Sequence, residues 1–203
     1  MATALLSSLQ QANLLPSKAI PADFTPTFDL TVRFPGESQT AISNGTLVRV
    51  SQVSQAPTIS ISANTAASPS AASPDAPKPT RLTLLLIDPD APTPDDPKFA
   101  YWRHWVVTGI PAPSTEVAAA ASEGRTLTAY LAPGPKDESG PHRYLFLLFA
   151  EPEGLELRAG DVGGEAFVER RSFGVEEFVG RHGLRLVGVQ WMRGVGDGWV
   201  GEE

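Results

Sequence analysis

The sequence predicts a mostly β, β-sandwich-like domain with a few short helices. Several segments alternate apolar and polar residues, as half-buried strands do. Three further segments are apolar on both faces, which is typical of central strands. The chain has 203 residues, of which 41% are hydrophobic and 19% charged. This length and composition suit one globular domain over residues 1–203, whose core needs no metal or disulfide support.

The first expected element is a short amphipathic helix. Within residues 3–15, Leu5, Leu6 and Leu9 recur at helical spacing, and Pro16 ends the pattern. We expect residues 1–20 to form a helical extension that docks on the domain. A membrane-surface anchor is the alternative, and it is disfavoured because the polar face of this helix carries no Lys or Arg.

The remaining elements follow in order along the chain. Half-buried strands are predicted at "FDLTVRF", "TLVRVSQV" and "PTISIS", which are residues 28–34, 46–53 and 57–62. Residues 63–80 are rich in Ala, Ser and Pro, which predicts a disordered or flexible insert. Buried central strands are predicted at 81–88, 102–109 and 141–150. A helix over 114–123, a strand over 125–131, a helix over 175–182 and a strand over 184–192 complete the domain.

Composition excludes several classes of function. The formal net charge is -7 and the chain has no basic tract, which argues against a nucleic-acid partner. The absence of cysteine excludes disulfides, thiolate zinc sites and cysteine nucleophiles. The N-terminus lacks a basic region, and no run of about 18 apolar residues exists. We therefore expect a cytoplasmic protein without a signal peptide or spanning helix.

Ionisable residues gather at the ends of the three central strands. Side-chain alternation places three sets on common strand faces: Leu84, Leu86 and Asp88; Trp102, His104 and Val106; and His142, Tyr144 and Phe146. Asp88 ends its strand and His104 begins the next, so antiparallel pairing brings both to one end of the sheet. The connection to the third strand is long enough for either direction, which leaves the position of His142 open.

Placing ionisable side chains at the edge of an apolar core costs free energy unless they are paired, solvated or bind a ligand. Two histidines, an aromatic wall and the glycine-bearing loop "APGPKDESGPHRY" would suit a small anion such as phosphate. Asp88 as a plain turn residue and His104 as a core histidine remain alternatives. Arg143, on the opposite face from His142, is expected to be structural.

Catalytic and metal functions are less well supported by the sequence. A Ser-His-Asp triad lacks a G-x-S-x-G elbow, and a metal site built from His104, His142 and Asp88 lacks a local two-ligand motif. Hydrolysis by Asp88 and the histidines stays an alternative to binding. We expect no cofactor, no metal and no catalytic residue.

Two ordered motifs resemble the phosphatidylethanolamine-binding protein family. "DPDAP" at 88–92 is followed by "DPK" at 96–98 and "WRHW" at 102–105, and "GP" at 134–135 precedes "GPHRY" at 140–144. The resemblance implies a large central antiparallel sheet packed on a smaller sheet, and an anion pocket at one end. By position, the pocket would contain Asp88, Asp90, Trp102, His104, Gly134, Pro135, His142 and Tyr144. The resemblance also implies that the Ala91–Pro92 peptide bond is cis. Phe99 stands at a position where members of this family often have a tyrosine.

The resemblance also bears on function. It implies a non-enzymatic, monomeric binding or regulatory protein that takes a phosphate-bearing head group and acts on a partner such as a serine carboxypeptidase or a signalling kinase. The N-terminal extension and the insert are similar to those of fungal members, which include carboxypeptidase Y inhibitors. A carboxypeptidase inhibitor working through its surface and N-terminal segment is therefore the alternative function.

Overall fold

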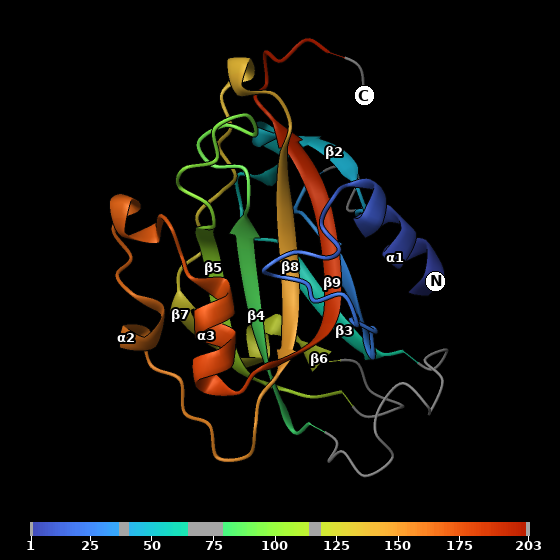
Figure 1. The fold of residues 1–203 in the computed structure, drawn as a ribbon, viewed down its shortest axis with the longest axis vertical. Helices are drawn as coiled ribbons and strands as arrows, with labels where there is room; N and C mark the ends of the chain where they lie inside the picture. Colours follow the sequence, from blue (N-terminus) through green and yellow to red (C-terminus); the bar gives the residue numbers. More distant parts are fainter. Residues whose placement is uncertain (1, 37–40, 65–78, 114–118, 202–203) are drawn as a thin grey trace.

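The computed structural model describes residues 2–36, 41–64, 79–113 and 119–201. Two β-sheets lie face to face, and the outer face of the larger sheet is covered by helices and the N-terminal segment (Figure 1). The prediction of a mostly β, sandwich-like fold with a few short helices is confirmed.

The large sheet has six strands in the spatial order β2-β9-β8-β4-β5-β7. Their bounds are β2 Thr46–Arg49, β4 Arg81–Asp88, β5 Trp102–Pro111, β7 Arg125–Thr128, β8 His142–Ala150 and β9 Arg185–Val195. Neighbouring strands are antiparallel except at one edge, where β2 runs parallel to β9. The expected large antiparallel sheet is therefore confirmed, with the short edge strand β2 as its one parallel neighbour.

The small sheet has three antiparallel strands in the order β1-β3-β6, namely β1 Phe28–Arg33, β3 Thr58–Ala63 and β6 Ala119–Ala120. Val32, Ile59 and Ile61 face the large sheet, where they pack with Leu84, Leu86 and Phe146. These side chains come from alternate positions along their strands, as the period-two pattern requires. They form the core between the two sheets.

A second core lies on the other face of the large sheet. Leu85, Ile87 and Leu147 pack there against side chains of the helices α1 (Ala2–Gln11), α2 (Ala159–Val162) and α3 (Val175–His182). Because the central strands are covered on both faces, their sequences are nearly continuous apolar runs.

The N-terminal segment belongs to this second core. Leu5 and Leu9 of α1 are buried, and so are Leu14, Ile20 and Phe24 in the segment that follows (blue in Figure 1). The prediction of a short amphipathic helix docked on the domain is confirmed. The contact extends well beyond the helix, so residues 1–20 are not a separable appendage.

Several predicted boundaries are wrong. Val50–Val53 forms a 3-10 helix rather than the second half of a strand, and β7 ends at Thr128. The predicted helix over 114–123 is wrong in its second half, where the chain forms β6 and then a 3-10 helix at Ala121–Glu123. Residues 114–118, its first half, lie outside the described ranges. β3 reaches Ala63, and most of the predicted 63–80 insert also lies outside those ranges.

A β-bulge in β5 changes the predicted alternation. Leu86 pairs with Trp105 whereas Ile87 pairs with Arg103, so His104 is an extra residue opposite β4. Trp105 therefore faces the core between the sheets, and Val106 faces the helix-covered core. The prediction that Val106 shares a face with His104 is wrong because a bulge re-aims the side chains around it.

Candidate functional site

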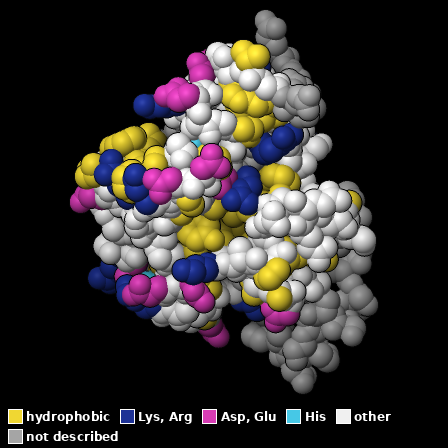
Figure 2. All heavy atoms as spheres, turned by 45° about the horizontal axis from the view of Figure 1, so that its top comes forward, with side chains coloured by type: hydrophobic (Ala, Val, Ile, Leu, Met, Phe, Trp, Pro, Cys, Tyr) yellow, Lys and Arg dark blue, Asp and Glu magenta, His cyan; other side chains and the backbone are white. Residues whose placement is uncertain are grey.

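The polar residues predicted from the sequence meet at the end of the large sheet where β4 ends and β5 and β8 begin. Because β8 runs antiparallel to β4, His142 lies at the same end as Asp88. A cavity of about 290 Å³ opens there, lined by Asp88, Ala91, Pro92, Phe99, Trp102, His104, Leu131, Ala132, Gly134, Pro135, Lys136, His142, Tyr144, Phe167 and Arg171. Figure 2 turns this end of the molecule toward the viewer, and hydrophobic, basic and acidic side chains are interspersed on it.

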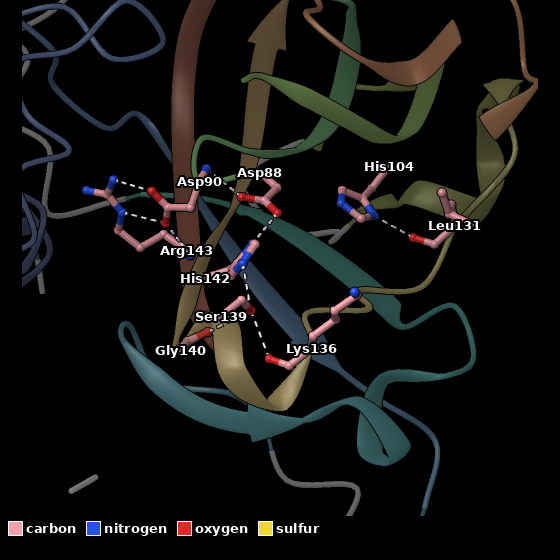
Figure 3. Close-up of polar contacts among 9 residues, drawn as sticks. All are labelled: Asp88, Asp90, His104, Leu131, Lys136, Ser139, Gly140, His142 and Arg143. Atoms are coloured by element: carbon pink, nitrogen blue, oxygen red, sulfur yellow. Dashed lines mark hydrogen bonds and ion pairs between the residues drawn. The ribbon is translucent and has the colours of Figure 1, made fainter. Parts of the chain in front are cut away.

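His142 is held at both ring nitrogens (Figure 3). Its Nδ1 lies 2.8 Å from Oδ2 of Asp88, and its Nε2 lies 3.2 Å from Oγ of Ser139. The other Asp88 oxygen accepts the backbone N–H of Asp90 at 2.6 Å. Asp88 and His142 are both almost completely buried, so these bonds fix the ring orientation.

The order Asp88, His142 and Ser139 is that of a nucleophile triad. However, Ser139 does not line the cavity, and its hydroxyl donates to the carbonyl of Lys136 at 2.8 Å. The chain of bonds therefore orients His142 and does not present a nucleophile to the cavity.

His104 presents one unpartnered ring nitrogen. Its Nδ1 lies 2.7 Å from the carbonyl oxygen of Leu131, which can only accept, so Nδ1 carries the hydrogen. Among the residues that the structure describes, none bonds Nε2. Arg170 Nη1 donates to the carbonyls of His104 and Ala129 and holds this backbone in place.

Burial controls the protonation of His104. Loss of hydration lowers the pKa of this ring below the ordinary histidine value, and the nearby Asp88 carboxylate opposes that shift. His104 is only 4% exposed. In its neutral form, Nε2 offers the cavity a lone pair and no hydrogen.

Tyr144 lies between the two histidines. Its ring centroid is 5.3 Å from that of His104 and 6.3 Å from that of His142. Burial, reinforced by the charge of Asp88, raises the pKa of the Tyr144 hydroxyl well above its ordinary value, so the hydroxyl stays protonated. Gly194 leaves room for this ring, because a Cβ there would lie 2.7 Å from Tyr144 Cε2.

Asp90 is the predicted pocket residue that does not line the cavity; the other seven do. Its carboxylate accepts from the backbone N–H of Arg143 at 2.7 Å and from the guanidinium at 2.9 and 2.5 Å. Arg143 Nη1 also donates to the carbonyl of Ala12. Figure 3 shows this pair on the far side of Asp88 from His104. The structural role expected for Arg143 is confirmed.

Sequence reasoning missed the contribution of the C-terminal region. Phe167 from the 3-10 helix η4 (Phe167–Arg170), and Arg171 after it, both line the cavity. Phe167 contacts the Trp102 ring at a centroid distance of 4.7 Å. The adjacent Arg170 and Arg171 were the only local signal in the sequence, and such basic pairs are common away from sites.

Further observations bear on the sequence expectations. The Ala91–Pro92 peptide is cis, as the resemblance implied. The described residues hold no cluster of three or more side chains that could bind a metal ion. In the same part of the chain, no helix has the length and apolarity needed to cross a bilayer.

Comparison with known proteins identifies the family. Residues 26–189 match the family model described as phosphatidylethanolamine-binding protein. The chain belongs to this family. The rice (Oryza sativa subsp. japonica) protein MOTHER of FT and TFL1 homolog 2 is 31% identical over 165 residues, which cover 80% of this chain and 78% of that protein.

Solved structures of other proteins share the fold. The structure described as carboxypeptidase Y inhibitor complexed with the cognate proteinase superposes with a TM-score of 0.79 at 24% identity, covering 97% of each chain. The phosphatidylethanolamine-binding protein from Plasmodium vivax superposes with a TM-score of 0.71 at 20% identity, covering 95% of this chain and 97% of that one.

The protonation of His104 predicts a pH-dependent stability. In the unfolded chain this ring takes up a proton near pH 6.5. In the folded protein it takes up the proton only at a lower pH, because its pKa is lowered. The free energy of unfolding should therefore fall as the pH drops below about 6.5, and this loss should level off below the folded-state pKa. We expect His104→Asn to flatten the profile between about pH 7.5 and 5 in urea titrations without phosphate. Parallel profiles for the two proteins would contradict this.

Proposed function

We propose that this protein is a non-enzymatic binding and regulatory protein whose cavity takes a small oxyanion, such as a phosphate-bearing head group. It would then act through protein partners. The observation that carries the proposal is the unpartnered Nε2 of the buried His104 ring at the wall of the cavity, beside a His142 ring whose orientation is already fixed. A preorganised polar group in a largely apolar pocket is typical of a ligand site.

The local charges support an anion despite the net charge of -7. Lys136 and Arg171 line the cavity, and Asp88 is the acidic side chain among the lining residues. Both oxygens of Asp88 already accept hydrogen bonds, from His142 and from the backbone of Asp90. An anion that enters the cavity therefore contacts the basic side chains, while the oxygens of the Asp88 carboxylate are bonded to His142 and Asp90.

Calorimetric titration with inorganic phosphate tests this function. His104→Asn keeps an N–H that can reach the Leu131 carbonyl but lacks the atom equivalent to Nε2, and we expect it to weaken binding about tenfold or more. His142→Asn should weaken binding as well, because the ring wall is lost. His182→Asn is the matched control, since His182 lies on α3 and does not line this cavity. Phosphate binding that is equal in all four proteins would exclude the cavity as the site.

Inhibition of a serine carboxypeptidase is a second candidate. It is favoured by the superposition on the carboxypeptidase Y inhibitor, since an alignment covering 97% of this chain has to include most of residues 1–20. In this function the surface and the N-terminal segment would contact the protease. Ser7 and Gln11 lie one helical turn apart on α1 and are exposed, so they offer such a contact.

An assay of carboxypeptidase Y activity separates the two functions. The double substitution Ser7→Glu and Gln11→Glu alters the exposed face of α1 and leaves its buried leucines in place. The inhibitor function would be supported if the unaltered protein inhibits the enzyme and the double variant does not, while both proteins bind phosphate equally. No inhibition by the unaltered protein would exclude it.

A further inference from the structure

The hydrogen-bonding state of His104 restricts which phosphates fit the cavity. Because Nδ1 donates to the Leu131 carbonyl, the neutral ring faces the cavity with an acceptor at Nε2. An anion that carries no hydrogen places one lone pair against another there. An anion with a P–OH group donates that hydrogen to Nε2 and makes a favourable bond.

The groups around His104 keep the ring in this state. The charged or titratable side chains that face it, or share its cavity, are Asp88, His142, Tyr144, Arg170, Lys136 and Arg171. Burial lowers the His104 pKa most strongly, and Arg170 and His142 lower it further. Asp88 and the hydrogen bond to the Leu131 carbonyl raise it, and the net shift is downward. Protonation of His104 without a ligand is therefore unfavourable near neutral pH.

Arg171 supplies a second contact. Its guanidinium carbon lies 4.3 Å from the Phe99 ring centroid and 5.7 Å from that of Trp102, so the two rings hold it in place. Nε of Arg171 is buried without a hydrogen-bond partner, and in the described part of the chain no carboxylate pairs with this side chain. Unpaired guanidinium donors at a cavity wall suit an oxyanion, which they bind in a two-pronged geometry.

We propose that the cavity is selective for phosphate monoesters over phosphodiesters, with His104 Nε2 accepting the P–OH hydrogen and Arg171 donating to the other phosphate oxygens. This inference rests on the proposed oxyanion-binding function and makes it specific. A phosphate monoester has its second pKa near about 6, so one proton is readily available to the complex close to neutral pH. A diester has no such proton, and it binds only after the buried ring has been protonated.

The organic part of the ester has a route out of the cavity. Phe167 lines the cavity and is 62% exposed, and the adjacent Val168 is 59% exposed. These side chains give an apolar substituent a surface at the mouth. A lipid with a terminal phosphate and a soluble phosphate ester share the chemistry that the cavity recognises.

Methyl phosphate and dimethyl phosphate test the proposal, because they differ by a single methyl group. Calorimetry at about pH 7 should show methyl phosphate binding at least about tenfold more tightly. In His104→Asn, the two esters should bind with similar affinity. Arg171→Gln should weaken the binding of both esters about tenfold and leave the preference in place. Arg181→Gln is the charge-matched control, since Arg181 pairs with Glu177 on α3 and does not line the cavity.

Each outcome separates this inference from the proposed function. Equal affinity of the unaltered protein for the two esters would overturn the selectivity and leave oxyanion binding intact. Binding of neither ester would overturn both. If His104→Asn still prefers methyl phosphate over dimethyl phosphate, His104 does not cause the selectivity, and the inference is contradicted.

Vesicles identify the source of the ester once the preference is established. Co-sedimentation with vesicles containing phosphatidic acid, but not with vesicles containing only phosphatidylethanolamine, would support a lipid monoester. Methyl phosphate binding without co-sedimentation on either vesicle would assign the cavity to soluble monoesters. Co-sedimentation on phosphatidylethanolamine vesicles that depends on His104 would contradict the selectivity.

Discussion

Arg143→Met is expected to lower the free energy of unfolding by about 3–5 kcal/mol, because it leaves a buried carboxylate without its counter-charge. The Asp90 side chain is only 1% exposed, whereas that of Arg143 is 29% exposed. Both carboxylate oxygens accept from the guanidinium. After the substitution, the backbone N–H of residue 143 remains as a donor to Asp90. The loss of the Ala12 contact adds to the effect.

Urea unfolding of a double-mutant cycle measures this pair. Asp90→Asn combined with Arg143→Met removes both charges, so the double variant should recover part of the stability that Arg143→Met loses. Lys98→Met is the control, because Lys98 and Asp96 form an exposed pair whose loss should change stability by about 0–1 kcal/mol. A loss in Arg143→Met that is no larger than in Lys98→Met would contradict the structural role of the pair.

Deletion of residues 1–20 is expected to abolish the cooperative folding of the protein. The deletion removes Leu5, Leu9, Leu14, Leu15 and Ile20 from the core on the outer face of the large sheet. Truncation of one such side chain to alanine typically lowers stability by about 2–5 kcal/mol. The combined loss of five such side chains is comparable to, or larger than, the roughly 5–15 kcal/mol that stabilises most domains.

Circular dichroism in the near ultraviolet and thermal unfolding measure this effect. The truncated chain should lose its fixed aromatic signal and its sharp transition. Leu9→Ala should unfold cooperatively at a lower temperature, and Gln10→Ala, at an exposed position on the same helix, should match the unaltered protein. A truncated chain that unfolds as sharply as the full chain would show that the segment is a separable appendage.

The sequence predicted the centre of the fold well. The strands β4, β5 and β8 are long apolar runs, and their side chains are buried on both faces, so local pattern and tertiary environment agree. α3 ends at His182, as predicted, and the following Gly183 adopts the left-handed conformation that ends a helix. The motifs around Asp88 and His142 predicted seven of the fifteen residues that line the cavity, because the antiparallel pairing of β8 with β4 brings both motifs to one end of the sheet.

Other features depend on contacts between distant segments. The bulge at His104 arises from the pairing of β5 with β4, and a strict alternation of faces cannot indicate it. Asp90 was predicted to reach the cavity, but Arg143 on β8 draws its carboxylate away. Arg171 reaches the site where η4 packs against Trp102, and a basic pair in the sequence does not by itself predict that contact.

The most direct test of the central claim is a nitrogen NMR titration of the three histidines, with ¹⁵N-labelled rings and methyl phosphate as the ligand. Without ligand near neutral pH, the His104 ring should be neutral, with the hydrogen on Nδ1 and a bare Nε2. Saturation with methyl phosphate should shift the Nε2 signal of His104 toward that of a hydrogen-bonded or protonated nitrogen, while both His182 nitrogens stay unchanged. A His104 spectrum that does not respond to a saturating ligand would contradict the account.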